Sequence, residues 1–453
     1  MKNTLNGTLK RDIGLGSAII LVIANMIGTG VFTTSGFIIA ELGSTQILLL
    51  CWVIGGLFAL FGALCYGELG AMYPHAGGEY AYLKESFGHM PAFISGWISL
   101  IVGFSAPIAA ASIAFGTYLL GKQENSWFVF ELGGYKIAEL NLISFVAILS
   151  VLILSYVHYH SVKVGKGVQN ALTAFKVFFV LSLIIGGFWF GNGDISRLTD
   201  GLTTSGGEFS WEHFSVALIF VSFAYSGWNA ASYIGGEIKN PEKNLPLSLF
   251  IGTLFVMVIY ILLNLLYVYA LPLEAMSGML ELGTGTSKAL FGENIGSFVG
   301  IAISLGLLSV VSAMIMAGPR VYYAMACDGL FFKRFQSVSC HRNTPVQAIV
   351  LQAVIAIVMI LTATFETLLI YIGFTLSLSS MLTVIGLMKL RITKPHTPRP
   401  YKTFLYPYVP LIFIFGNLGI IMFSLISRPI VSLYGIITIG IGVGMYYLFK
   451  NKI

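Results

Sequence analysis

Long apolar runs separated by short polar segments follow one another along the whole chain. A membrane-spanning helix needs about 20 predominantly apolar residues. Twelve runs meet this length and are numbered here as helices 1–12. They lie near 13–40, 45–72, 91–120, 140–158, 167–190, 213–235, 246–270, 295–326, 346–363, 366–390, 403–427 and 429–449. The pattern predicts an all-α integral membrane protein with twelve transmembrane helices.

Composition supports a lipid environment, because 57% of the residues are hydrophobic and only 10% are charged. Soluble domains carry about 25% charged residues. The first run has no small-residue cleavage site after it, so no cleavable signal peptide is expected. The lipid bilayer is therefore the predicted partner of most of the surface.

The loop charges predict an orientation. With a cytoplasmic N-terminus, 18 Lys and Arg residues lie in inside loops and 5 in outside loops. Positive residues accumulate on the cytoplasmic side. The protein is therefore predicted to lie in the inner cell membrane with both termini in the cytoplasm. The net charge of +6 follows from this topology and does not indicate a nucleic-acid partner.

The four cysteines predict neither a disulfide framework nor a metal site. Cys51 and Cys65 fall in helix 2, and Cys327 and Cys340 lie near the cytoplasmic side. Their spacing does not match a metal-ligand motif. No cofactor and no disulfide-linked accessory subunit are expected.

Glycine-containing breaks interrupt two of the apolar runs at corresponding places. Helix 1 contains Gly28-Thr29-Gly30, and helix 6 contains 223–229, about 200 residues later. Inverted repeats with discontinuous helices are a known transporter plan, in which half-helix ends bind charged substrate groups. We expect a cytoplasmic segment 1–12, repeats 13–190 and 212–391, and helices 11 and 12 with the C-terminus in 392–453. Close helix packing is the alternative explanation of Gly28 and Gly30.

Four motifs carry a resemblance to a known family, the amino acid–polyamine–organocation transporters, and in particular to its sodium-independent bacterial permeases. They are Asn25–Phe32, Tyr66–Leu69 with Tyr73–Tyr82, Phe223–Asn229 with Glu237–Pro241 and Asn244–Pro246, and Arg320–Ala326 with Asp328-Gly329. The resemblance implies a LeuT-type fold with a 5+5 inverted repeat, and alternating-access transport of an amino acid.

The resemblance also implies a substrate site at the two breaks. The substrate carboxylate is expected at Thr29 and Gly30, and the α-amino group at carbonyls near Met26 and in helix 6. The implied substrate-binding residues are Met26, Ile27, Gly28, Thr29, Gly30, Phe223, Ala224 and Ser226. Asn25, Ser105, Ile108, Asn229 and Met314 are further expected lining residues.

Lys176 is the most informative single residue, because it lies about 14 Å along helix 5 from the predicted cytoplasmic end. An ionisable residue at such depth is a functional candidate. In sodium-independent relatives a lysine replaces the sodium ion between helices 1, 5 and 8. Lys176 is expected to meet carbonyls near Val22 and Ile23, and Ser309 in helix 8. It either exchanges a proton during transport, stays as a fixed charge, or has only a structural role.

The expected pocket residues include no carboxylate, which favours a neutral amino acid as substrate. A cationic substrate remains open, because the helix 8 motif resembles the cationic branch. Proton symport and exchange also remain open. Flux would distinguish a transporter from a transporter-like sensor. An enzyme is not expected, because no nucleophile–base pair stands out at membrane depth.

A few other charged residues receive weaker predictions. Arg320 is expected to extend towards the cytoplasmic surface, with a gate contact as the second choice. Glu237 is either half of a cytoplasmic gate ion pair or a solvated helix end. His75, His158 and His160 are expected to be exposed.

Overall fold

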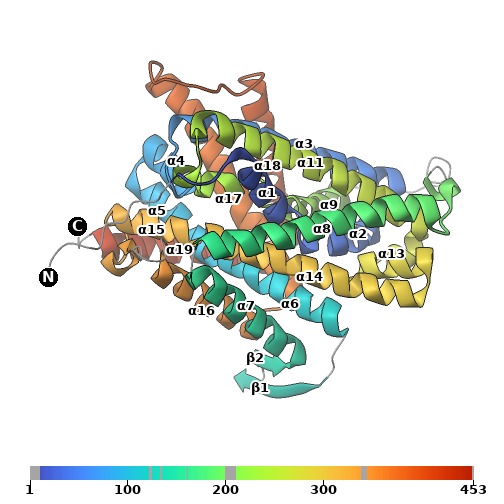
Figure 1. Cartoon of the computed structure of the whole chain (residues 1–453). Coiled ribbons are helices and arrows are strands. Elements are labelled where there is room, and N and C mark those ends of the chain that lie inside the picture. The colour runs from blue at the N-terminus through green and yellow to red at the C-terminus, as the bar shows by residue number, and fades with distance from the viewer. Residues whose placement is uncertain are drawn as a thin grey trace.

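The computed structural model describes residues 11–121, 125–132, 135–160, 162–198, 211–337 and 344–450. Helices dominate this part of the chain (Figure 1). Ten of them are long and apolar enough to cross a membrane, and two shorter apolar helices span His213–Ala224 and Val346–Thr362. The chain is a multi-pass membrane protein.

The first part of the chain runs from α1 to α8. Its elements are α1 (Leu15–Met26), α2 (Thr29–Leu42), α3 (Thr45–Met72), α4 (Glu79–Phe87), α5 (His89–Ile98), the π-helix η1 (Ser99–Ser105), α6 (Ala106–Leu120), β1 (Ser126–Leu132), β2 (Tyr135–Asn141), α7 (Leu142–His160) and α8 (Val162–Phe190). A 3-10 turn, η2 (Ile195–Leu198), follows α8.

The second part runs from α9 to the C-terminal helices. Its elements are α9 (Trp211–Ala224), α10 (Ala230–Tyr233), η4 (Gly235–Glu237), α11 (Pro241–Ala270), α12 (Leu273–Met276), α13 (Leu282–Phe291), α14 (Glu293–Ala317), α15 (Pro319–Cys327), η5 (Lys333–Gln336), α16 (Val346–Thr362), α17 (Phe365–Thr393), α18 (Tyr408–Ser427) and α19 (Pro429–Lys450).

The described chain is mostly helical, as predicted, and carries one short β-hairpin that the sequence analysis did not predict. Strands β1 and β2 pair antiparallel beside the ends of α6 and α7 (Figure 1). The sequence of β1 contains Trp127, Phe128, Val129 and Phe130, residue types that favour strands. Only the end of β2 overlapped the predicted helix 4, and α7 begins after it at Leu142.

Both predicted breaks are present as interruptions of helical structure. Helix α1 ends at Met26 and α2 begins at Thr29, while α9 ends at Ala224 and α10 begins at Ala230. Gly227 has a φ of 93°, and a Cβ there would lie 3.0 Å from Asn25 backbone and side-chain atoms. Only glycine suits this conformation and this approach. The two breaks therefore lie directly against each other.

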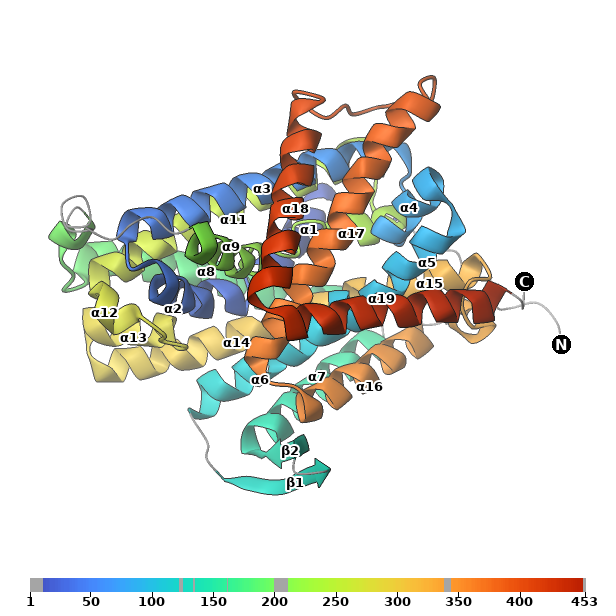
Figure 2. The ribbon, with the colours of Figure 1, turned by 180° about the vertical axis from the view of Figure 1, so that it is seen from behind.

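Helices from distant parts of the sequence pack side by side around the breaks. Helix α11 packs along α3, and α1 lies against both α11 and α14. Helices α17 and α18 lie side by side, and α19 packs on α5 (Figure 2). Large apolar side chains remain exposed on the outer faces, as lipid contact requires; on α7 these are Phe145, Leu149, Leu152 and Ile153.

Candidate functional site

The ammonium group of Lys176 lies at the first break. Its side chain is 1% exposed, and Nζ donates hydrogen bonds to the carbonyl oxygens of Ala24 (2.9 Å) and Ile27. The lysine stem lies against Gly306 of α14. These carbonyls would otherwise end α1 without partners. The buried Lys176 side chain on α8 thus holds the end of α1.

The hydrogen-bond partners of Lys176 in the structure differ in detail from those expected from the sequence. The hydrogen-bonded carbonyls belong to Ala24 and Ile27 rather than to Val22 and Ile23. Ser309 is buried on α14, and its hydroxyl donates to the carbonyl of Gly306 at 2.8 Å. The error is a shift along α1, because the lysine reaches the end of the helix, where carbonyls are free.

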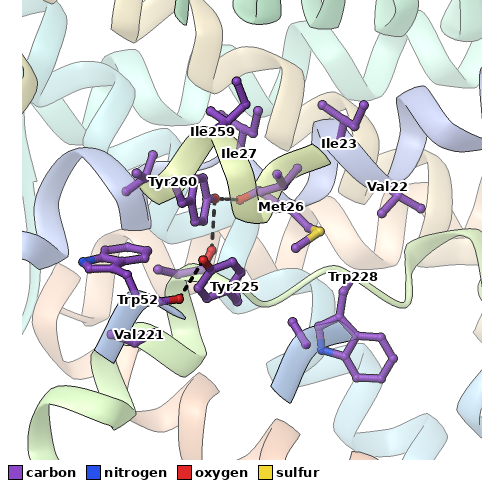
Figure 3. Packing of buried hydrophobic residues seen from close by; sticks show 14 of the residues in the cluster. Val22, Ile23, Met26, Ile27, Trp52, Val221, Tyr225, Trp228, Ile259 and Tyr260 are labelled. Atoms are coloured by element: carbon purple, nitrogen blue, oxygen red, sulfur yellow. Dashed lines mark hydrogen bonds between the residues drawn. The ribbon is translucent and has the colours of Figure 1, made fainter. Parts of the chain in front are cut away.

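A tyrosine joins the two breaks. The hydroxyl of Tyr260 on α11 donates to the carbonyl of Met26 and lies 3.1 Å from the carbonyl oxygen of Ala224. Figure 3 shows Tyr260 beside Met26, with Tyr225 and Trp52 next to it. The Tyr225 hydroxyl donates to the carbonyl of Trp52 at 2.9 Å. One hydroxyl of a neighbouring helix thus lies between carbonyls that both breaks free, and its single proton is shared between them.

A cavity lies beside the second break, between α4, η1, α9, α17 and α18. It contains about 980 Å³ of empty space, counting space open to solvent. Its polar lining consists of Asn25, Glu79, Ser222, Ser226, Asn229, Tyr233, Ser377, Ser380 and Asn417.

The cavity gathers some of the expected residues and leaves others out. Asn25, Phe223, Ser226, Asn229 and Met314 line it. The other expected residues are buried, in the first break or in the helices, and are not part of the lining: Met26, Ile27, Gly28, Thr29, Gly30, Ala224, Ser105 and Ile108. Gly30 packs so closely on Ala224 that an added Cβ would lie 2.5 Å from its Cα.

Glu79 is the main residue that sequence reasoning missed. It is 2% exposed, begins α4 and lines the cavity, so the expectation of a lining without carboxylates is wrong. Its oxygens accept hydrogen bonds from Tyr66 (2.6 Å), Asn229 (2.9 Å) and Ser379 (2.7 Å). The signal was an acidic residue inside the Gly77-Gly78-Glu79-Tyr80 motif, which lies between the predicted runs 45–72 and 91–120.

Arg320 and Glu237 form a buried ion pair. Arg320 Nε lies 2.8 Å from Glu237 Oε1, with side chains 3% and 5% exposed. The prediction that Arg320 extends to the cytoplasmic surface is wrong, and so is the option of a solvated Glu237. Each charge is neutralised by the other inside the protein. The pair joins α15 to the segment after α10.

One of the three histidine predictions also fails. His75 and His160 are exposed, but His158 is 4% exposed, and its Nε2 lies 2.8 Å from the hydroxyl of Ser312. The helix continues to His160, so His158 belongs to the packed face of α7 rather than to a loop.

Comparison with known proteins identifies the family of this membrane protein with two broken helices. The family model described as amino acid permease matches residues 13–447. The chain belongs to this amino acid permease family. This permease therefore transports amino acids, and its relatives are named as transporters rather than enzymes.

Three relatives cover nearly all of this permease. Mouse large neutral amino acids transporter small subunit 2 is 30% identical, over 97% of this chain and 81% of the relative. Mouse b(0,+)-type amino acid transporter 1 is 30% identical, over 98% and 88%. The serine/threonine exchanger SteT of Bacillus subtilis (strain 168) is 29% identical, over 99% of both chains.

Proposed function

We propose that this permease carries a neutral L-amino acid across the inner cell membrane by alternating access, without sodium. Its architecture is proposed as LeuT-type: twelve spans, inverted repeats at 13–190 and 212–391, helices 11 and 12 in 392–453, and cytoplasmic termini including 1–12. The breaks at Gly28 and Gly227 and the biased loop charges support this arrangement.

The buried ammonium of Lys176 carries the proposal of sodium independence. A cation bonded to the Ala24 and Ile27 carbonyls, with its stem against α14, stands where sodium would otherwise join these helices. A covalently attached charge removes the need for an ion from solution. Ser309, on the same stretch of α14, is proposed to belong to this site.

A neutral substrate fits the observed hydrogen bonding of the cavity. Glu79 is its carboxylate, and both oxygens already accept hydrogen bonds from neutral side chains. A cationic substrate side chain would have to displace these donors. The names of the large neutral amino acid and serine/threonine relatives point in the same direction. A cationic amino acid is the alternative.

The proposed substrate backbone site remains at the breaks, with Met26, Ile27, Gly28, Thr29, Gly30, Phe223, Ala224 and Ser226. Phe223 and Ser226 face the cavity here. The Met26 and Ala224 carbonyls are held by Tyr260, so an α-amino group must replace that hydroxyl as the breaks separate. No disulfide-linked subunit is proposed, since the four cysteines lie in helix 2 and near 327–340.

Reconstitution into sodium-free liposomes tests the proposal. Uptake of labelled serine, threonine, alanine, leucine and arginine is measured with vesicles either empty or preloaded with amino acid, and with or without an inward proton gradient. Sodium-free uptake of a neutral amino acid supports the proposal. Preference for arginine would establish the cationic alternative, and a strict sodium requirement would overturn the assignment of Lys176.

The same experiment separates a transporter from a sensor. Binding of an amino acid without flux under any of these conditions would identify a transporter-like sensor. Uptake into empty vesicles indicates symport or facilitated entry, whereas uptake only into preloaded vesicles indicates exchange.

A further inference from the structure

Three carboxylates are buried among the described residues, and their surroundings differ. Glu237 pairs with Arg320 at 2.8 Å. Glu68 is held by Arg391 at 2.6 Å and by Arg399 at 3.3 Å. A neighbouring guanidinium keeps a carboxylate ionised. Glu79, by contrast, has no cation within ion-pair distance among the residues that the structure describes.

All partners of Glu79 are neutral hydrogen-bonding groups from three helical regions. Oε1 accepts from the Tyr66 hydroxyl of α3 and from the Asn229 amide at the second break. Oε2 accepts from the Ser379 hydroxyl of α17. The titratable neighbours are phenols, Tyr66, Tyr82 and Tyr233, which are uncharged near neutral pH.

The two oxygens are not equivalent. Asn229 can only donate through its amide nitrogen, which fixes Oε1 as an acceptor. The Ser379 hydroxyl can reverse, because it also lies 3.3 Å from the hydroxyl of Ser95 on α5. A proton on Oε2 would then be donated to Ser379, and Ser379 would donate to Ser95. The site accommodates both the charged and the neutral form.

Burial favours the neutral form. It raises the pKa of the Glu79 carboxyl above its usual range, although the three hydrogen bonds act in the opposite direction. Glu79 also lines the substrate cavity, which supplies a route for protons from water.

Resting on the proposed function, we propose that Glu79 Oε2 binds the proton that is transported together with the amino acid. The proton is taken up from the side where the cavity opens and forms the O–H bond of a neutral carboxylic acid. The same bond breaks when the proton leaves on the other side, and Lys176 stays a fixed charge.

Protonation would also change how the helices are joined. The carboxylate ties Asn229, at the second break, to Ser379 on α17 through charge-assisted hydrogen bonds, which are stronger than neutral ones. Neutralising Glu79 weakens this link. Proton binding and separation of the second break from α17 are thereby coupled.

The test measures proton movement directly in sodium-free liposomes that contain a trapped pH-sensitive dye. Addition of neutral amino acid is expected to acidify the lumen of vesicles with wild-type protein. Glu79→Gln, which is nearly isosteric, is expected to abolish acidification, and its exchange into preloaded vesicles is measured alongside. Glu85→Gln is the matched control, because Glu85 is a half-buried residue of the same helix that pairs with Lys394 and does not line the cavity, so the variant should behave as wild type.

The outcomes separate this inference from the proposed function. The proton site is overturned if vesicles with Glu79→Gln still acidify, or if the wild-type protein carries amino acid without moving protons. Either result leaves the proposal of amino acid transport intact. Absence of flux in every arm overturns the proposed function. If Glu79→Gln loses all activity, Ser379→Ala decides. Ser379→Ala removes the hydroxyl that would accept the hydrogen bond of neutral Glu79, so the pH midpoint of uptake should differ from that of the wild type. A pH profile equal to the wild-type profile would overturn the inference.

Discussion

At the residue scale, the described core neutralises its buried charges in different ways. Glu68 and Glu237 have arginine partners, Lys176 is surrounded by carbonyls, and Glu79 by neutral donors. Arginine pairs fix the charge state of a carboxylate, whereas the neutral donors around Glu79 leave its charge state adjustable. Lys176 at the end of α1 and Glu79 beside the cavity both lie where transport requires movement.

Replacing Lys176 should lower the rate of transport by more than the accompanying loss of stability explains. Lys176→Met keeps most of the stem but leaves the Ala24 and Ile27 carbonyls without the ammonium, and a buried unsatisfied acceptor costs about 1–3 kcal/mol. We expect uptake to fall by about tenfold or more, equivalent to about 1.4 kcal/mol or more. Lys166→Met, on the same helix but half-buried, should retain wild-type uptake in the liposome assay. Equal uptake by both variants would refute a functional role of Lys176.

The Arg320–Glu237 pair should behave as a buried unit. Removing one partner strands a charge and costs about 3–5 kcal/mol, whereas replacing both with apolar residues can be neutral. Arg320→Met and Glu237→Leu should each lower the thermal unfolding midpoint in detergent, and the double variant should recover most of the loss.

The exposed pair Lys288–Glu293 supplies the comparison for that measurement. Its side chains are 40% and 78% exposed, so breaking it should cost about 0–1 kcal/mol. Additive losses in the Arg320–Glu237 double variant, rather than recovery, would show that the two side chains do not act as a unit.

At the element scale, the two breaks depend on α11. Tyr260→Phe removes the hydroxyl shared by the Met26 and Ala224 carbonyls, and we expect an unfolding free energy lower by about 1–3 kcal/mol. Tyr267→Phe is the matched control on the same helix, because its buried hydroxyl has no hydrogen-bond partner among the residues that the structure describes. It should be neutral or slightly stabilising. Thermal unfolding of both variants checks this, and a larger loss for Tyr267→Phe would contradict it.

The breaks were predictable from sequence, but the cavity was only partly so. Gly28, Gly30 and Gly227 interrupt apolar periodicity, which leaves a clear trace in the sequence. The lining by Ser377, Ser380 and Asn417 depends on how α17 and α18 pack against α9, which no local pattern encodes. The π-helix η1 likewise changes which helix 3 residues face the cavity: Gly103, Phe104 and Pro107 replace Ser105 and Ile108.

At the scale of the whole molecule, hydropathy predicted most helix positions, because lipid contact requires long apolar segments. The run 45–72 coincides with α3. The partners of buried charges such as Arg320 and Glu237 were harder to predict than helix positions, since this pair joins residues 83 positions apart. Depth along a single helix identifies an unusual charge, but only the fold identifies its partner.

Cysteine labelling tests the proposed orientation of the whole molecule. Among the described cysteines, Cys327 is exposed, whereas Cys51 and Cys65 are buried. In a Cys340→Ser background, a membrane-impermeant maleimide should label inside-out vesicles and leave intact cells unlabelled, because Cys327 is predicted to face the cytoplasm. Cys327→Ser in the same background is the control and should remove the signal. Labelling of intact cells instead would place the end of α15 outside and reverse the orientation derived from the loop charges, and with it the direction in which Glu79 would bind and release protons.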